Sequence, residues 1–108
     1  MSMFTADLVS PSVTTPRRAE RRPLSAPAQC RRGSSRETVD VLDLSPAGAR
    51  VRAVAPLRTG YTVWLKLPGI DAQEARVVWT VGFESGCEFL RPLYPAVFET
   101  VAMHARSH

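Results

Sequence analysis

Residues 38–53, TVDVLDLSPAGARVRA, contain two runs of alternating apolar and polar residues with a turn between them. Each run has the period of two that is typical of a strand with one buried face. The turn at residues 43–48 contains Asp, Ser, Pro and Gly, which bond to the local backbone or accept unusual dihedral angles. We therefore predict two antiparallel strands joined by a short turn. Their alternating apolar positions are Val39, Val41, Ala49, Val51 and Ala53.

The same alternation of apolar and polar residues recurs before and after this pair of strands in the sequence. The connections at residues 56–60, 68–71 and 81–86 are short and contain Pro or Gly, and short links between alternating strands imply antiparallel neighbours. Five or six strands in about 70 residues fit best in a small closed or nearly closed barrel. The further runs are a weak first strand at 24–30, interrupted by Pro27, and stronger runs at 61–67, 75–81 and 87–89.

A change of period predicts a helix at residues 95–106. Pro95 suits the first position of a helix. The apolar residues that follow recur at helical spacing, so we expect this helix to cover one end of the barrel. They are Val97, Phe98, Val101, Ala102 and Ala105.

Composition limits the class of protein. The 108 residues leave room for one small core, and 22% charged residues indicate a globular chain. No apolar run is long enough to span a membrane, and the first twelve residues have neither the cations nor the apolar run of a secretory signal. Cys30 and Cys87 form neither a disulfide framework nor a metal motif. We therefore expect a cytoplasmic protein without a membrane partner.

Positive charge is concentrated at the N-terminal end. Residues 1–36 carry seven Arg against two acidic residues, a net +5, whereas residues 37–108 carry seven cations against eight acidic residues, a net −1. We expect residues 1–16 to be a flexible leader and residues 17–23, RRAERRP, to be a basic arm. The predicted domain spans 17–106, with the barrel at 24–92.

The sequence offers little for catalysis. His104 and His108 lie at the C-terminal end, and no nucleophile elbow, Walker pattern or Gly-x-Gly-x-x-Gly loop is present. No His, Cys and carboxylate set has metal-ligand spacing. We expect neither an enzyme nor a bound metal or cofactor.

The arm and the turn at 43–48 together point to a ligand. Arginine forms paired hydrogen bonds with phosphate oxygens and guanine edges, and its flat face stacks on purines. Asp43 and Ser45 offer acceptors for guanine N–H groups, and Gly48 permits close approach to the backbone. This combination suits a ligand that contains both phosphates and guanines.

The pairing of Arg-Arg-x-x-x-Arg with Asp-x-Ser-x-x-Gly resembles the PilZ domain, a bacterial receptor module for cyclic di-GMP. The likeness covers roughly residues 17–101, and the strand pair with Val77-Val78-Trp79 and Gly86-Cys87-Glu88-Phe89 is similar to the closing strands of that family. The resemblance implies a six-stranded antiparallel barrel with a C-terminal helix. It also implies a non-enzymatic, second-messenger receptor whose arm orders on the nucleotide and signals to a partner protein.

The resemblance also assigns the ligand-binding residues. Arg18 and Arg22 match the Arg-x-x-x-Arg motif, and Arg17 matches the extra arginine before it. Arg17 and Arg21 satisfy the same spacing, but a preceding Arg and a following Pro favour Arg18 and Arg22.

The turn residues follow from the same match. Asp43 and Ser45 match the residues that bind a guanine edge, and Gly48 matches the glycine that shapes the turn.

Two other functions remain open. A PilZ-like adaptor would act through protein contacts without the nucleotide. A basic-arm nucleic-acid binder is the weaker alternative, because the arm lacks aromatic residues and residues 37–108 carry a net charge of −1.

The role of Trp64 is unassigned, since alternation places it on the face opposite Val63 and Leu65. Three roles are open for Trp64: an exposed contact with a partner protein, a contact with the C-terminal helix, or packing on its own face of the barrel. The last two are favoured.

Overall fold

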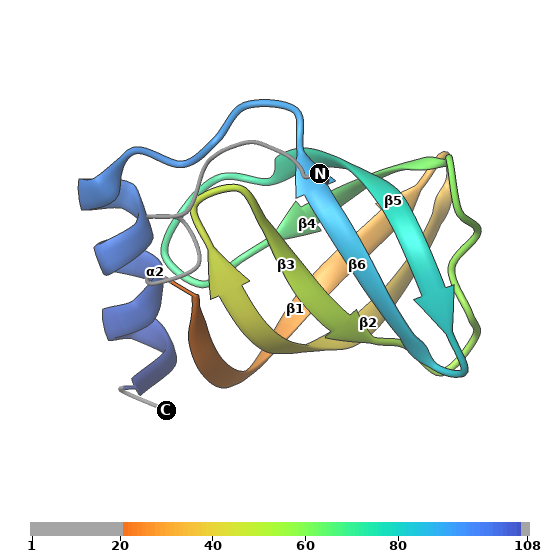
Figure 1. Ribbon diagram of the computed structural model, residues 1–108, viewed down its shortest axis with the longest axis horizontal. Coiled ribbons are helices and arrows are strands. Elements are labelled where there is room, and N and C mark those ends of the chain that lie inside the picture. Colours follow the sequence, from red (N-terminus) through yellow and green to blue (C-terminus); the bar gives the residue numbers. More distant parts are fainter. Residues whose placement is uncertain (1–20, 107–108) are drawn as a thin grey trace, which may run out of the picture.

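The computed structural model describes residues 21–106, which fold into a closed six-stranded barrel with one helix (Figure 1). Neighbouring strands in the order β1-β2-β3-β6-β5-β4 are all antiparallel, and β1 pairs with β4 to close the barrel. This confirms the fold that the alternation and the PilZ resemblance predicted. The leader at 1–16 and arm residues 17–20 lie outside the described residues. The elements are β1 (Arg22–Arg32), β2 (Ser35–Ser45), β3 (Gly48–Arg52), β4 (Thr62–Lys66), β5 (Gln73–Val81), β6 (Glu84–Phe89) and α2 (Pro95–Arg106).

The inward positions of the strands form the core. In β3 and its continuation, Ala49, Val51 and Ala53 are at most 4% exposed, and in β4 both Val63 and Leu65 are fully buried. Burial of a Val or Leu side chain contributes about 1.5–3 kcal/mol to stability. The alternation at the centre of the sequence therefore predicted the buried face of these strands correctly.

Strand β1 is longer than its sequence suggests. It extends over 11 residues, and Ala26, Ala28 and Cys30 point into the core with at most 4% exposure. All three residues pair with β2, and Cys30 also pairs with Leu65 of β4 on the other side. Tertiary pairing therefore overrides the weak strand propensity of this segment.

The alternation fails in the second half of β5. It would place Trp79 and Val81 on the same face as Ala75 and Val77, but Trp79 is 38% exposed and Val81 is 73% exposed. The pairing of β5 with β6 shifts between Val77 and Trp79, so the strand carries an extra residue there. A bulge of this kind turns the following side chains to the other face.

Helix α2 stands across one end of the barrel, opposite the β5–β6 hairpin (Figure 1). Phe98, Val101 and Ala102 are at most 3% exposed and face the core. The predicted helix and its apolar face are both confirmed. No described helix is long and apolar enough to cross a membrane.

Arg22 joins the start of β1 to this helix. Its guanidinium donates to both carboxylate oxygens of Glu99, at 2.9 and 2.6 Å, and lies 5.0 Å from the centroid of the Phe98 ring. The two charged side chains are 41% and 49% exposed, so solvent screens the pair. Arg22 therefore helps to dock α2 without being buried itself.

Replacing Arg22 with alanine should lower the stability of the domain modestly. An exposed ion pair and a cation–π contact of a partly exposed guanidinium together contribute about 1 kcal/mol, which corresponds to a fall in Tm of about 5 °C. Differential scanning calorimetry measures this directly. Arg91→Ala, which removes an exposed arginine without such contacts, is the control; an equal fall in both variants would contradict the docking role of Arg22.

The two cysteines should be unreactive in the folded protein. Both are free and buried, and burial raises the pKa of the Cys30 thiol to about 11 and that of Cys87 to about 12, from an ordinary value of 9.0. At pH 8 we expect no labelling by Ellman's reagent until the chain is unfolded, when two thiols react. Fast labelling of either cysteine in the native state would show that the barrel interior is open to solvent.

Candidate ligand-binding site

A hollow of about 330 Å³ lies on the outer surface of the barrel, over the β2–β3 turn and strands β3, β5 and β6. It is lined by two arginine side chains, one large aromatic ring and one carboxylate, that of Glu88. It is therefore suited to a ligand with both negative charge and flat rings. The lining residues are Arg21, Ser45, Ala47, Gly48, Ala49, Arg50, Val78, Trp79, Gly86, Cys87 and Glu88.

The Asp43 carboxylate holds both cations of the hollow in place. Asp43 is only 7% exposed. Its Oδ1 accepts a hydrogen bond of 2.5 Å from Arg21 Nη1, and its Oδ2 accepts one of 2.8 Å from Arg50 Nε. A buried charge of this kind is stable only when it is paired in this way.

Arg50 is also fixed from its other side. Its Nη1 donates to Glu84 Oε1 at 2.7 Å. Hydrogen bonds to Asp43 and then to Glu84 raise the pKa of the Arg50 guanidinium above its already high ordinary value. The hollow therefore has a permanently charged guanidinium whose position is set by two carboxylates.

The Ser45 hydroxyl closes the β2–β3 turn. Ser45 is buried, and its Oγ accepts hydrogen bonds of 3.2 Å from the backbone N–H groups of both Ala47 and Gly48. A side chain that bonds the backbone two and three residues ahead fixes a tight turn. In this structure Ser45 shapes the wall of the hollow.

Gly48 lets strands β3 and β6 approach each other. A Cβ at this position would lie 2.1 Å from the carbonyl oxygen of Cys87. Only a residue without a side chain fits beside that carbonyl. The sequence analysis assigned Gly48 to the close approach of a ligand. In the structure the group that approaches Gly48 is the Cys87 carbonyl of the neighbouring strand β6.

Trp79 lies against Gly86 on the floor of the hollow. A Cβ on Gly86 would be 2.1 Å from the indole Nε1 of Trp79, so the missing side chain provides the space for the ring. The bulge before Trp79 brings the ring to the outer surface, where it is 38% exposed. An aromatic ring held in this way offers a surface for stacking.

A second bulge places Asp43. The pairing of β2 with β3 shifts between Val41 and Asp43, so Leu42 is the extra residue. Asp43 then pairs with Arg50, which explains their contact. Bulges occur often beside functional sites because they turn single side chains.

The structure brings together four of the residues chosen from the sequence. Arg21, Ser45 and Gly48 line the hollow, and Asp43 bonds to its two arginines. Arg22 does not join them, since its guanidinium is bonded to Glu99 on α2.

Arg17 and Arg18, the remaining predicted contacts, lie outside the described residues. The sequence reasoning did not select Arg50 or Trp79 as site residues. Alternation did place Arg50 on the outer face. Its contact with Asp43 and the exposure of Trp79 both depend on the two β-bulges, which alternation does not predict.

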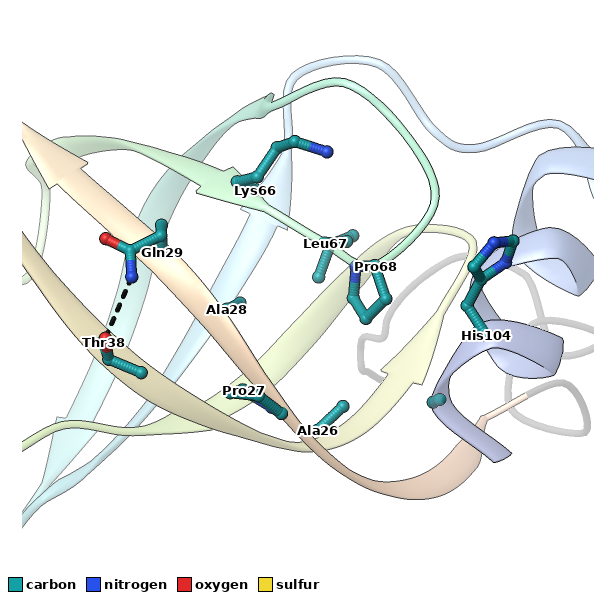
Figure 2. A pocket seen from close by; sticks show the side chains of 10 residues that line it. Ala26, Pro27, Ala28, Gln29, Thr38, Lys66, Leu67, Pro68 and His104 are labelled. Atoms are coloured by element: carbon teal, nitrogen blue, oxygen red, sulfur yellow. Dashed lines mark hydrogen bonds between the residues drawn. The ribbon is translucent and has the colours of Figure 1, made fainter. Parts of the chain in front are cut away.

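A further hollow, of about 320 Å³, lies between β1, the loop after β4 and α2 (Figure 2). Its lining is mostly apolar, with Ala26, Pro27 and Pro68 on its walls. His104 closes one end, where its ring lies against Gly69; a Cβ there would be 2.7 Å from His104 Nδ1. Lys66 is the one Lys or Arg side chain that lines this groove, whereas the first hollow has two arginines that bond to one carboxylate. Within residues 21–106, no three His, Cys, Asp or Glu side chains form a set that could hold a metal ion.

Comparison with protein families gives one result that agrees with this geometry. The family model of the PilZ domain matches residues 15–101. The chain belongs to the PilZ domain family. PilZ domains are generally non-enzymatic, and the family consists of receptors and adaptors for cyclic di-GMP. No curated protein sequence matches the chain.

The contact between Gly86 and Trp79 is open to a double-mutant test. Gly86→Ala should destabilise the domain by about 1–3 kcal/mol, because the added methyl group displaces the indole. The same change in a Trp79→Ala background should cost clearly less, since no ring stands in the way. Chemical denaturation of the four proteins measures this coupling. Equal costs in both backgrounds would mean that Gly86 serves only the strand and not the ring.

Proposed function

We propose that this PilZ protein is a receptor that binds cyclic di-GMP in the hollow beside Asp43. The observation that carries this proposal is the pairing of Arg21 with Asp43, which holds an arm guanidinium beside Arg50 and the exposed ring of Trp79. The hollow thus combines two cations with one stacking surface. These are the groups that a ligand with two phosphates and two guanines requires.

Each group has a distinct role in this proposal. Arg21 and Arg50 donate to phosphate oxygens or to the acceptor edge of guanine. Trp79 stacks on a base. Asp43 acts mainly as a positioning residue, because its two oxygens already accept hydrogen bonds from both arginines.

The position of Arg21 supports the register with Arg17 and Arg21 for the Arg-x-x-x-Arg motif. Arg21 faces the hollow, whereas Arg22 faces α2. We therefore propose Arg17 and Arg21 as the pair that contacts the nucleotide, and Arg22 as a residue that docks the helix. In this register Arg18 lies within the motif, and Pro16 occupies the position of the extra arginine before it.

The energies are adequate for a receptor. A hydrogen bond to a charged group contributes about 1.5–3 kcal/mol, and stacking of a base on an aromatic ring contributes about 1–3 kcal/mol. Three such contacts and one stacked base contribute about 5.5–12 kcal/mol, a range that includes the roughly 8 kcal/mol of a micromolar complex before the cost of ordering the arm. Ligand binding then fixes the arm over the barrel and changes the surface that a partner protein meets.

The two neighbouring arginines provide a matched test. Arg21→Ala and Arg22→Ala remove the same charge one residue apart. In calorimetric titrations with cyclic di-GMP we expect Arg21→Ala to weaken binding at least tenfold, and Arg22→Ala to change it less than threefold. GTP and a short RNA serve as controls for generic attraction to the basic arm.

Each other outcome has a definite meaning. Loss of binding in Arg22→Ala alone would support the register with Arg18 and Arg22. Absence of binding by the folded native chain would overturn the receptor function and leave the adaptor that acts through protein contacts alone.

A further inference from the structure

The outer face of β1, β2 and β4 carries a second group of cations around Trp64. The strand register places Arg31 directly beside Arg36 on β2 and beside Trp64 on β4, with Lys66 two residues further along β4. The Arg31 guanidinium lies 5.5 Å from the centroid of the Trp64 ring. We call Arg31, Arg36 and Lys66 the cationic strip.

In the described part of the chain, the cationic strip is not bonded to acidic side chains, although Glu74 of β5 lies beside Trp64 on its other side. Within residues 21–106, none of the three forms an ion pair, whereas the next residue, Arg32, pairs with Glu37 at 3.3 Å. Arg31 donates only to the backbone carbonyl of Gly33, at 3.4 Å, and Lys66 donates to the carbonyl of Ile70. Like charges directly opposite each other on two strands destabilise a sheet. The pair of Arg31 and Arg36 is therefore a cost to the fold that an anionic partner would remove.

The strip is continuous with the apolar groove of Figure 2. A hollow of about 200 Å³ beside Trp64 shares Gln29 and Lys66 with that groove. Figure 2 shows both residues above the apolar wall formed by Ala26, Pro27 and Pro68. Gln29 is held by a hydrogen bond of 2.9 Å from its Nε2 to Thr38 Oγ1. Cationic and apolar surfaces thus follow one another along β1.

We infer that this face binds an extended acidic segment of a partner protein that carries an apolar side chain. Carboxylates of the segment would bind the cationic strip, and its apolar side chain would occupy the groove between β1 and Pro68. This inference rests on residues outside the proposed nucleotide site. The cyclic di-GMP hollow uses β3, β5, β6 and the C-terminal end of β2, so both surfaces can be occupied together.

A protein segment fits this face better than a nucleic acid does. Bases bind barrel surfaces by stacking on open aromatic rings. Trp64 is partly buried, and Arg31 lies over its ring. The adjoining groove is lined largely by Ala, Pro and Leu side chains, which form no hydrogen bonds with base edges. Charge complementarity combined with an apolar groove matches an acidic, amphipathic peptide.

The inference is tested by NMR titration of the full chain with a defined peptide. The probe is a 12-residue peptide of Asp and Glu with two Leu residues; its Asn and Gln counterpart and a 12-nucleotide oligothymidylate are the comparisons. We expect the acidic peptide alone to shift the amide signals of residues 26–38 and 62–68. Arg36→Glu should weaken this binding at least tenfold. Arg58→Glu, which makes the same charge change at another exposed arginine, should have less than a threefold effect.

The same variants separate this inference from the receptor function. Arg36→Glu should bind cyclic di-GMP like the native chain. The inference is overturned if the peptide causes no shifts at the strip, or if Arg36→Glu and Arg58→Glu weaken it equally. It is also overturned, in favour of a nucleic-acid surface, if the oligothymidylate binds instead with the same dependence on Arg36.

Discussion

The Asp43 carboxylate is the contact on which the candidate site depends. It lies at the end of β2, is almost completely buried, and accepts hydrogen bonds from an arm arginine and from Arg50 on β3. Through Arg50 it is linked to Glu84 on β6. One carboxylate thus connects segments of the chain that are far apart in sequence. Removal of one partner from such a buried network leaves an unpaired charge, which is far more costly than loss of a surface pair.

Much of the fold follows from the period of two in the sequence. Ala49, Val51 and Val63 are buried where alternation places them, and the apolar positions of residues 95–106 form the inner face of α2. The candidate site is harder to predict from this alternation, because Asp43 and Trp79 lie directly after positions where the alternation is broken. The bulges at Leu42 and Val78 turn Asp43 and Trp79 to the outer face of the barrel, where Asp43 is buried and Trp79 is partly exposed. A bulge adds one residue to one strand, and no residue type in these stretches marks its position.

The arginine motif illustrates the same difficulty. In extended backbone, adjacent side chains point in opposite directions. Arg21 and Arg22 therefore face different parts of the molecule, although the spacing of the motif treats them as interchangeable. Composition identified the arm, the PilZ resemblance identified the motif, and only the pairing partners Asp43 and Glu99 distinguish the two residues.

Closure of the barrel between β1 and β4 has a consequence for how this protein meets others. Many small β-domains recruit a partner by adding its strand to a free sheet edge, where backbone hydrogen bonds give affinity and pockets for alternate side chains give selectivity. Within residues 21–106 every strand has a neighbour on both sides, and the shortest contact is that of β1 with β4, which pair only through Gln29, Cys30 and Arg31. A partner that bound the wall of the barrel would therefore be selected mainly by side chains that point outward from the strands. Single substitutions on that surface can change the partner while the barrel itself stays the same.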